Sequence, residues 1–275
     1  MQPAQKDLDG VYRHTWDSLG AMVEDAFSDD AQSLHNAEDI RERIQNNTNS
    51  KWANHKTPDD LRAMLVSPDK KLLRAIDAMR STLADDLALP TVPRRRVRHG
   101  REDGEEMDAD RWLVREPNCW DRTVRESVPR RTVIIGINLS VHCQQKPAEL
   151  LYRGAAACAL ADVLTLRGMN VGIVGFLVVN GMSSGCPELV SKVEIKAPDM
   201  PLDMAALSTA ACEIGFFRMV MVYATARRAI GKLDGSLGGP SHLPECDRAG
   251  LTYVIEQSVC SHDAAVDWLR EAVSE

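Results

Sequence analysis

The stretch Thr132-Val133-Ile134-Ile135-Gly136-Ile137 decides the fold, because its only polar side chain is the threonine at its first position. An almost wholly apolar run of this length is typical of a parallel strand that is buried on both faces of a sheet. The charged sequence that precedes the run ends at Arg131. We therefore expect a central strand, and with it an α/β domain, to begin at about residue 131.

The sequence downstream alternates between further strands and helices. Small and apolar residues recur at three- and four-residue spacing from Pro147 to Arg167, which predicts a helix, and Gly168 follows it as a C′ glycine does. This alternation predicts a mostly parallel sheet with helices on both faces over residues 131–275. The other predicted strands are 171–179, 189–195 (an antiparallel edge strand), 216–224 and 251–257, and the other predicted helices are 202–214 and 264–273.

Residues 1–90 are predicted to form a helical N-terminal region. Tyr12, Trp16, Leu19 and Val23 recur at helical spacing and indicate one apolar helical face. Further along, Thr57 is the predicted N-cap of a helix whose first turn holds a proline and two aspartates. Another helix is expected to follow the sequence Ser-Pro-Asp at 67–69.

Residues 91–130 are predicted to form a charged, irregular arm or β-hairpin between these two regions. Trp112 and Trp120 are its expected anchors. The acidic run from Glu102 to Asp110 comes directly after a cluster of five arginines. These are Arg94, Arg95, Arg96, Arg98 and Arg101.

Composition narrows the function classes. The net charge of −7 argues against a dedicated nucleic-acid binder, although the arginine cluster leaves RNA binding as a third hypothesis. Seven cysteines without CxxC spacing favour reduced thiols in a cytoplasmic protein. The most apolar stretch, Val171 to Val179, is far shorter than the roughly 20 residues of a membrane-spanning helix. We therefore expect a cytoplasmic protein, or a virion-associated one if a phage encodes it, with no membrane contact.

Three consecutive features resemble the start of a von Willebrand A (vWA) domain. They are the segment TVIIGINLSVHC at 132–143, the alanine-rich helix that follows, and the segment GMNVGIVGF at 168–176. The layout is most similar to the vWA-bearing subunit of cobaltochelatase, and the likeness covers roughly Glu102 to Glu275. The resemblance implies a vWA-like sheet in which another strand separates the first strand from the last.

The resemblance also implies positions for a metal site of the MIDAS type. Asn138 falls on the first aspartate of the family's DxSxS motif, Ser140 keeps the first serine, and His142 replaces the second. Asp203 stands on the second loop, and Thr225 falls where an aspartate is expected after the fourth strand. Because both expected carboxylates are missing, we predict a degenerate site with no cofactor; weak Mg²⁺ binding is the alternative.

Two other chemistries fit the sequence less well. Ser140, His142 and Asp203 lack the nucleophile elbow and oxyanion-hole glycine of a hydrolytic triad. A tetrahedral Zn²⁺ site at the carboxyl ends of the first and last strands lacks the spacing of a zinc knuckle. Its four candidate ligands are His142, Cys143, Cys260 and His262.

The sequence therefore favours a non-catalytic protein-interaction or scaffolding module. The resemblance implies an AAA+ ATPase of the MoxR or chelatase type as the first candidate partner, and a homo-oligomer or a phage-type assembly is equally compatible with it. A metal-chelatase-like enzyme subunit is the alternative function. We expect the partner interface to include Tyr12, Trp16, Leu19 and Val23, although these side chains also suit an ordinary intramolecular core.

Overall fold

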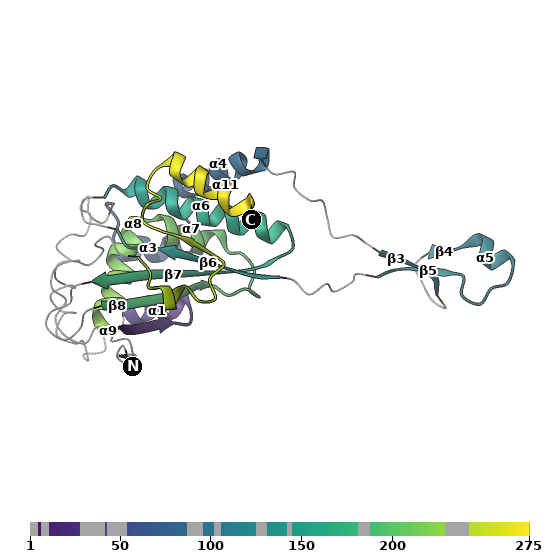
Figure 1. Ribbon diagram of the computed structural model, residues 1–275, viewed down its shortest axis with the longest axis horizontal. Helices are drawn as coiled ribbons and strands as arrows, with labels where there is room; N and C mark the ends of the chain where they lie inside the picture. Colours follow the sequence, from purple (N-terminus) through teal and green to yellow (C-terminus); the bar gives the residue numbers. More distant parts are fainter. Residues whose placement is uncertain are drawn as a thin grey trace. The chain divides into compact units, whose positions relative to one another are not determined.

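The computed structural model forms two compact units (Figure 1). It describes residues 5–6, 11–27, 42, 54–86, 96–101, 106–124, 131–141, 145–180, 188–228 and 242–274. The large unit comprises Met1–Ala88 together with Thr132–Glu275, and the small unit comprises Leu89–Arg131. The first 88 residues thus share a unit with the α/β region.

The large unit is built on a six-stranded sheet with the order β1-β2-β8-β7-β6-β9. β6 pairs in parallel with β7 and β9, β2 pairs in parallel with β8, and β8 is antiparallel to β7. A mixed α/β fold with a mostly parallel sheet is therefore confirmed. The strands are β1 (Gln5–Lys6), β2 (Tyr12–Trp16), β6 (Thr132–Asn138), β7 (Asn170–Asn180), β8 (Glu188–Lys196) and β9 (Tyr253–Ile255).

The helices of the large unit begin and end near the predicted signals. Thr57 caps the helix Pro58–Met64, and both halves of its capping box form with Asp60. Gly168 follows the longest helix with φ +82°, which glycine adopts without strain. The helices are α1 (Leu19–Phe27), α3 (Pro58–Met64), α4 (Lys70–Asp86), α6 (Pro147–Leu166), α7 (Met204–Cys212), α8 (Ile214–Phe216), the π-helix η2 (Phe217–Met221), α9 (Val222–Arg228), α10 (Glu245–Arg248) and α11 (His262–Ser274).

Three predicted elements differ from the structure. Residues 216–224 are helical rather than a strand, because an apolar run that is buried on every side has the same sequence pattern in either state. With that strand missing, β9 pairs directly with β6. Residues 12–16 form the strand β2 rather than part of a helix, and α1 begins only at Leu19. Because β2 pairs with the outer side of β8, β8 is not an edge strand.

Helices flank the sheet, but the described helices are divided unevenly between its two faces. Ile135 and Ile137, which point to the same face, lie in one core with residues of α1, α4, α6, α7, α9 and α11. On the opposite face the described residues include only the four-residue helix α10 and its flanks, over Phe176 and Val190. The right-handed crossover rule concerns a connection between two parallel strands. It does not apply to the connection 197–252, because β8 and β9 run in opposite directions.

Two ion pairs hold α10 against that second face. Asp247 of α10 is buried and accepts from Arg13 of β2 at 2.9 Å and from Lys192 of β8 at 2.6 Å. These two hydrogen-bonding cations lower the pKa of Asp247, although its burial acts in the opposite direction. The carboxylate therefore joins two neighbouring strands to the segment that covers them.

The small unit contains a three-stranded antiparallel sheet with the order β3-β5-β4. Its elements are β3 (Arg96–Arg101), β4 (Glu106–Met107), α5 (Ala109–Leu113) and β5 (Trp120–Val124). Asp108 caps α5 by accepting from the N–H groups of Asp110 and Arg111. The charged segment thus forms a hairpin-like sheet with one short helix.

None of the helices in the described ranges is by itself long and apolar enough to cross a membrane. The pair Met204–Cys212 and Ile214–Arg228, bent by 70° at its break, passes on length and composition alone. Both helices of the pair are largely buried against the sheet and its other helices.

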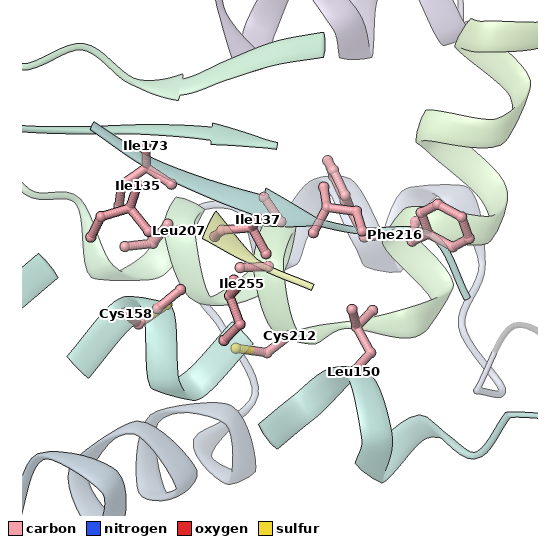
Figure 2. Close-up of a cluster of buried hydrophobic side chains, with 14 of the residues drawn as sticks. Ile135, Ile137, Leu150, Cys158, Ile173, Leu207, Cys212, Phe216 and Ile255 are labelled. Carbon is pink, nitrogen blue, oxygen red and sulfur yellow. The ribbon is translucent and has the colours of Figure 1, made fainter. Parts of the chain in front are cut away.

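The centre of the large core lies between β6 and the helices α6 and α7. Figure 2 shows Ile135, Ile137 and Ile255 from the strands beside Leu150 of α6 and Leu207 of α7. All five side chains are buried, and Ile135 and Ile137 have no exposed surface. This layer is therefore part of the buried interior, where protein side chains are close-packed.

Replacing Ile135 by alanine should lower the free energy of unfolding by about 2–5 kcal/mol, through lost burial and a residual cavity. Chemical denaturation followed by circular dichroism measures this loss. Val66→Ala is the matched control, because Val66 is 85% exposed and its truncation should change stability by less than about 0.5 kcal/mol. A loss below about 1 kcal/mol for Ile135→Ala would contradict the central position of β6.

Candidate functional site

The carboxyl end of β6 carries the polar residues that the sequence singled out. Asn138 is the last residue of the strand, Ser140 follows it, and both are fully buried. The Asn138 side chain accepts from the N–H of Ser140 at 3.0 Å and donates to Glu256 Oε2 at 2.9 Å. The structure therefore brings two of the five predicted metal positions together, but each is already engaged by a neighbour.

A buried guanidinium, which sequence reasoning missed, lies beside these two residues. Arg153 is the largest fully buried side chain of the described chain and projects from the second turn of α6. It donates to the carbonyl oxygens of Asn138 at 2.5 Å and Ser140 at 3.1 Å, and at longer range to those of Gln257 at 3.4 Å and Val259 at 3.5 Å. One cation thus binds the segments that follow β6 and β9.

Burial lowers the pKa of Arg153 to about 10, while Glu256 and Glu149 nearby act to raise it. The guanidinium therefore stays charged at neutral pH, so a positive charge is permanently present at the carboxyl end of the central strands. A second cation would meet this charge at short range and low dielectric, which disfavours it. The carbonyl oxygens of Asn138 and Ser140 already accept hydrogen bonds from Arg153.

Glu256, the carboxylate that Asn138 contacts, is also held by other side chains. Glu256, directly after β9, accepts from Arg248 at 2.5 Å as well as from Asn138, and His242 Nδ1 lies 3.7 Å from it. Within the ranges that the structure describes, no group of three or more His, Cys, Asp or Glu side chains is placed to hold a metal. In the described residues the contacts of this cluster bind and orient backbone segments.

The remaining predicted metal positions do not join this cluster. Asp203 caps α7 by accepting from the N–H groups of Ala205 and Ala206. Asp203 comes shortly after the carboxyl end of β8. Because β8 runs antiparallel to β7, that end is at the opposite edge of the sheet from Asn138. Thr225 is buried inside α9 rather than behind a strand. His142 lies outside the described residues.

The predicted zinc and triad residues are likewise not assembled among the residues that are described. Cys260 and His262 are both exposed, and His262 Nδ1 lies 3.3 Å from its neighbour Asp263. Cys143, like His142, falls outside the described ranges. Asp203 is engaged as a helix cap, as described above, while Ser140 is buried at the other end of the sheet.

The buried carboxylate of Glu213, which sequence reasoning also missed, joins the N-terminal region to the break between α7 and α8. Glu213 caps α8 through the N–H of Gly215, and Asn54 donates to its two oxygens at 3.0 and 3.3 Å. Burial raises the pKa of Glu213. Asn54 and His55 both have positive φ angles, of 55° and 57°, in the left-handed region where asparagine and histidine are enriched among non-glycine residues. An asparagine in a loop was the only sequence signal.

The side chains predicted to form a partner interface lie in or against the core of the large unit. Trp16 is 4% exposed and Leu19 8% exposed, and Tyr12 and Val23 are partly buried against the same core. The Trp16 indole donates to Asp25 at 2.9 Å, and Asp25 also accepts from Arg228 at 2.6 Å. In the structure these residues dock β2 and α1 onto α9.

More than half of the large apolar side chains that are exposed in the described ranges lie in the small unit. Of the seven large apolar side chains that are exposed in the described ranges, four fall within eight residues of this unit. We call them the tip surface; they are Met107, Trp112, Leu113 and Val114. Trp112 was predicted as an anchor of the arm, but its exposure is a tertiary property that its sequence neighbours do not reveal.

Replacing Arg153 by methionine should reduce the free energy of unfolding by about 3 kcal/mol or more. The change leaves buried carbonyl oxygens without donors, and hydrogen bonds to charged groups are each worth about 1.5–3 kcal/mol. Denaturant titration measures the loss, and Arg270→Met is the control on an exposed arginine. An Arg153→Met chain as stable as wild type would contradict the structural role of the guanidinium.

Stability should fall as the pH drops below about 6.5, in part because of His14. Burial and the nearby Arg228 lower the pKa of His14, although Asp25 and Asp17 oppose the shift. The unfolded chain therefore takes up a proton first, so stability is complete above the unfolded pKa and declines as the pH falls toward the folded pKa. Thermal melts of wild type and His14→Gln between pH 5 and 8, where histidine titrates, should show a shallower decline for the variant. Identical slopes would exclude His14 as a contributor.

Comparison with known proteins places the whole chain in one family. No curated protein and no solved structure matches it. A family model described as a domain of unknown function (DUF7192) matches residues 4–274. Because this match spans both units and nearly every residue, the protein belongs to the DUF7192 family.

Proposed function

We propose that the protein is a non-catalytic interaction or scaffolding module. The observation that carries this proposal is the buried Arg153, which holds the carboxyl end of the central strands where open α/β sheets usually bind their ligands. The polar groups there bind one another, and four of the seven large apolar side chains that are exposed in the described ranges lie on the small unit. Such a molecule presents surfaces rather than a reactive site.

Within this proposal the large unit is a vWA-like domain. The parallel pair β6 and β7, the helix α6 between them and the antiparallel β8 support this assignment. The direct pairing of β9 with β6 and the helical 216–224 segment depart from the strand order of that family. An AAA+ ATPase of the MoxR or chelatase type is the partner that a vWA-like domain suggests. Assembly in a phage-type particle is the other setting we propose.

Co-purification of the full-length chain from its native source tests the proposal. An interaction module should be recovered in a stoichiometric complex, either with another protein or with further copies of itself, as judged by native mass spectrometry. A chain recovered only as a monomer that retains one equivalent of a transition metal would instead favour the chelatase-like alternative. Elemental analysis of the same sample distinguishes the two results.

Millimolar Mg²⁺ should leave the melting temperature unchanged, because Asn138 is already engaged and Arg153 supplies the local positive charge. A metal present at about 100 times its dissociation constant would stabilise the fold by roughly 2.7 kcal/mol. The substitution Asp203→Ala removes the α7 cap and by itself costs about 1 kcal/mol. The quantity to compare between wild type and Asp203→Ala is therefore the shift in melting temperature on adding Mg²⁺. A rise of several degrees in wild type would contradict the prediction, and its loss in Asp203→Ala would show that Asp203 takes part in the binding.

A further inference from the structure

Two buried thiols lie in the core between α6 and α7 and have no part in the proposed function. Cys158 has no exposed surface, Cys212 is 2% exposed, and both are free cysteines. Cys158 belongs to the middle of α6, and Cys212 is the last residue of α7. Figure 2 shows both among the side chains of this core. The fold therefore brings two nucleophilic groups from distant parts of the sequence into one dry layer.

Gly154 allows the two sulfur atoms to adjoin. A Cβ at this position would stand 2.7 Å from Cys212 Sγ, so the sulfur occupies the space that a side chain would otherwise take. Cys158 is one turn further along the same face of α6, and residues four apart on a helix have Cβ atoms about 5–6 Å apart. Helical side chains lean toward the N-terminus of their helix, so Cys158 leans toward Gly154 and the sulfur above it.

The ionisation of Cys212 reflects the same contact. Hydrogen bonding to the Cys158 thiol and burial raise the pKa of Cys212, and the nearby Glu213 acts in the same direction. Cys212 therefore stays protonated at neutral pH and reacts slowly, because the thiolate is the nucleophilic form. This slows the reaction without fixing its outcome. The equilibrium between dithiol and disulfide depends instead on how closely the fold holds the two sulfur atoms.

We propose that Cys158 and Cys212 form a site of reversible disulfide formation, which links α6 to the end of α7 when the chain meets a low-molecular-weight disulfide. One cysteine attacks this oxidant, forms a mixed disulfide and releases one small thiol, which takes up the proton. The second cysteine attacks the mixed disulfide, forms the bond between Cys158 and Cys212, and releases a second small thiol with its proton. Two electrons thus pass from the two cysteines to the oxidant. The site does not depend on the scaffolding function.

The end of α7 gives the oxidant a route to the buried pair. The helix ends at Cys212, and the helical segment that begins at Ile214 is bent from it by 70°. Fraying ends open at a lower free energy than the centre of a packed helix. Opening at this end exposes Cys212 before Cys158, so Cys212 is the attacking thiol. The rate of oxidation should rise with pH, because the thiolate fraction of the opened Cys212 grows.

The bond would also stabilise the fold. It closes a long loop of chain that includes β7, β8 and most of α7. A cross-link over a long loop stabilises mainly by restricting the unfolded chain. The oxidised chain should therefore melt about 5 °C or more above the reduced chain.

Equilibration of the purified full-length chain in buffers with a rising ratio of oxidised to reduced glutathione tests the inference. Alkylation in denaturant followed by peptide mapping should recover a peptide that joins Cys158 to Cys212 and has lost two hydrogen atoms. Cys158→Ala and Cys212→Ala should each abolish both this peptide and the rise in melting temperature. The matched control is Cys246→Ala with Cys260→Ala, which removes two exposed thiols and should leave both results unchanged.

Two results would overturn the inference. One is a native chain whose exposed Cys246 and Cys260 react with glutathione while Cys158 and Cys212 stay open to alkylation at every ratio. The other is a linked chain that melts below the reduced chain. By thermodynamic linkage, the unfolded chain would then favour the bond more than the native fold does, so the fold would hold the two sulfur atoms apart.

Discussion

The carboxyl ends of the two parallel strands β6 and β9 are held together by one buried cation. The Arg153 guanidinium donates to main-chain carbonyl oxygens at the end of β6 and just after β9. The side chain of Gln257 adds a hydrogen bond to the Ser140 carbonyl oxygen at 2.9 Å. Backbone groups that leave a strand inside a protein must find partners, because an unpaired buried carbonyl is costly. A single planar donor with five N–H groups meets that requirement for several carbonyls at once.

Small residues around the arginine allow α6 to approach the rest of the fold closely. A Cβ on Gly154 would stand 2.1 Å from the Ala211 carbonyl oxygen, so only glycine permits α6 and α7 to pack at this separation. The alanine-rich stretch that follows on α6 is fully buried, which keeps the helix close to both the sheet and α7. Close packing thus excludes water from Arg153, and the absence of water in turn strengthens each of its hydrogen bonds.

Charged residues anchor the N-terminal region to this framework in the same way. Asp25 joins the Trp16 indole to Arg228, Asp247 joins Arg13 to Lys192, and Glu213 holds the 54–57 loop. Each carboxylate links a segment from the first 88 residues to one beyond residue 190. Buried ionic contacts of this type are weak evidence for added stability but specify which segments meet. They explain how β2, near the N-terminus, joins a sheet whose other long strands come more than a hundred residues later.

The sequence by itself predicted the α/β class, the central strand at 132–137, the long helix with its glycine stop and the Thr57 cap, because these depend on local apolar period and on local hydrogen bonds. It also indicated Asn138 and Ser140 at the end of the central strand. The tertiary structure alone decided that 216–224 is a helix, that β2 joins the sheet and that Trp16 is buried. An apolar run specifies burial but not its partner, and the partners of Arg153, Asp25 and Glu213 are distant in sequence. Which side chain satisfies a buried polar group is settled only when those distant segments pack together.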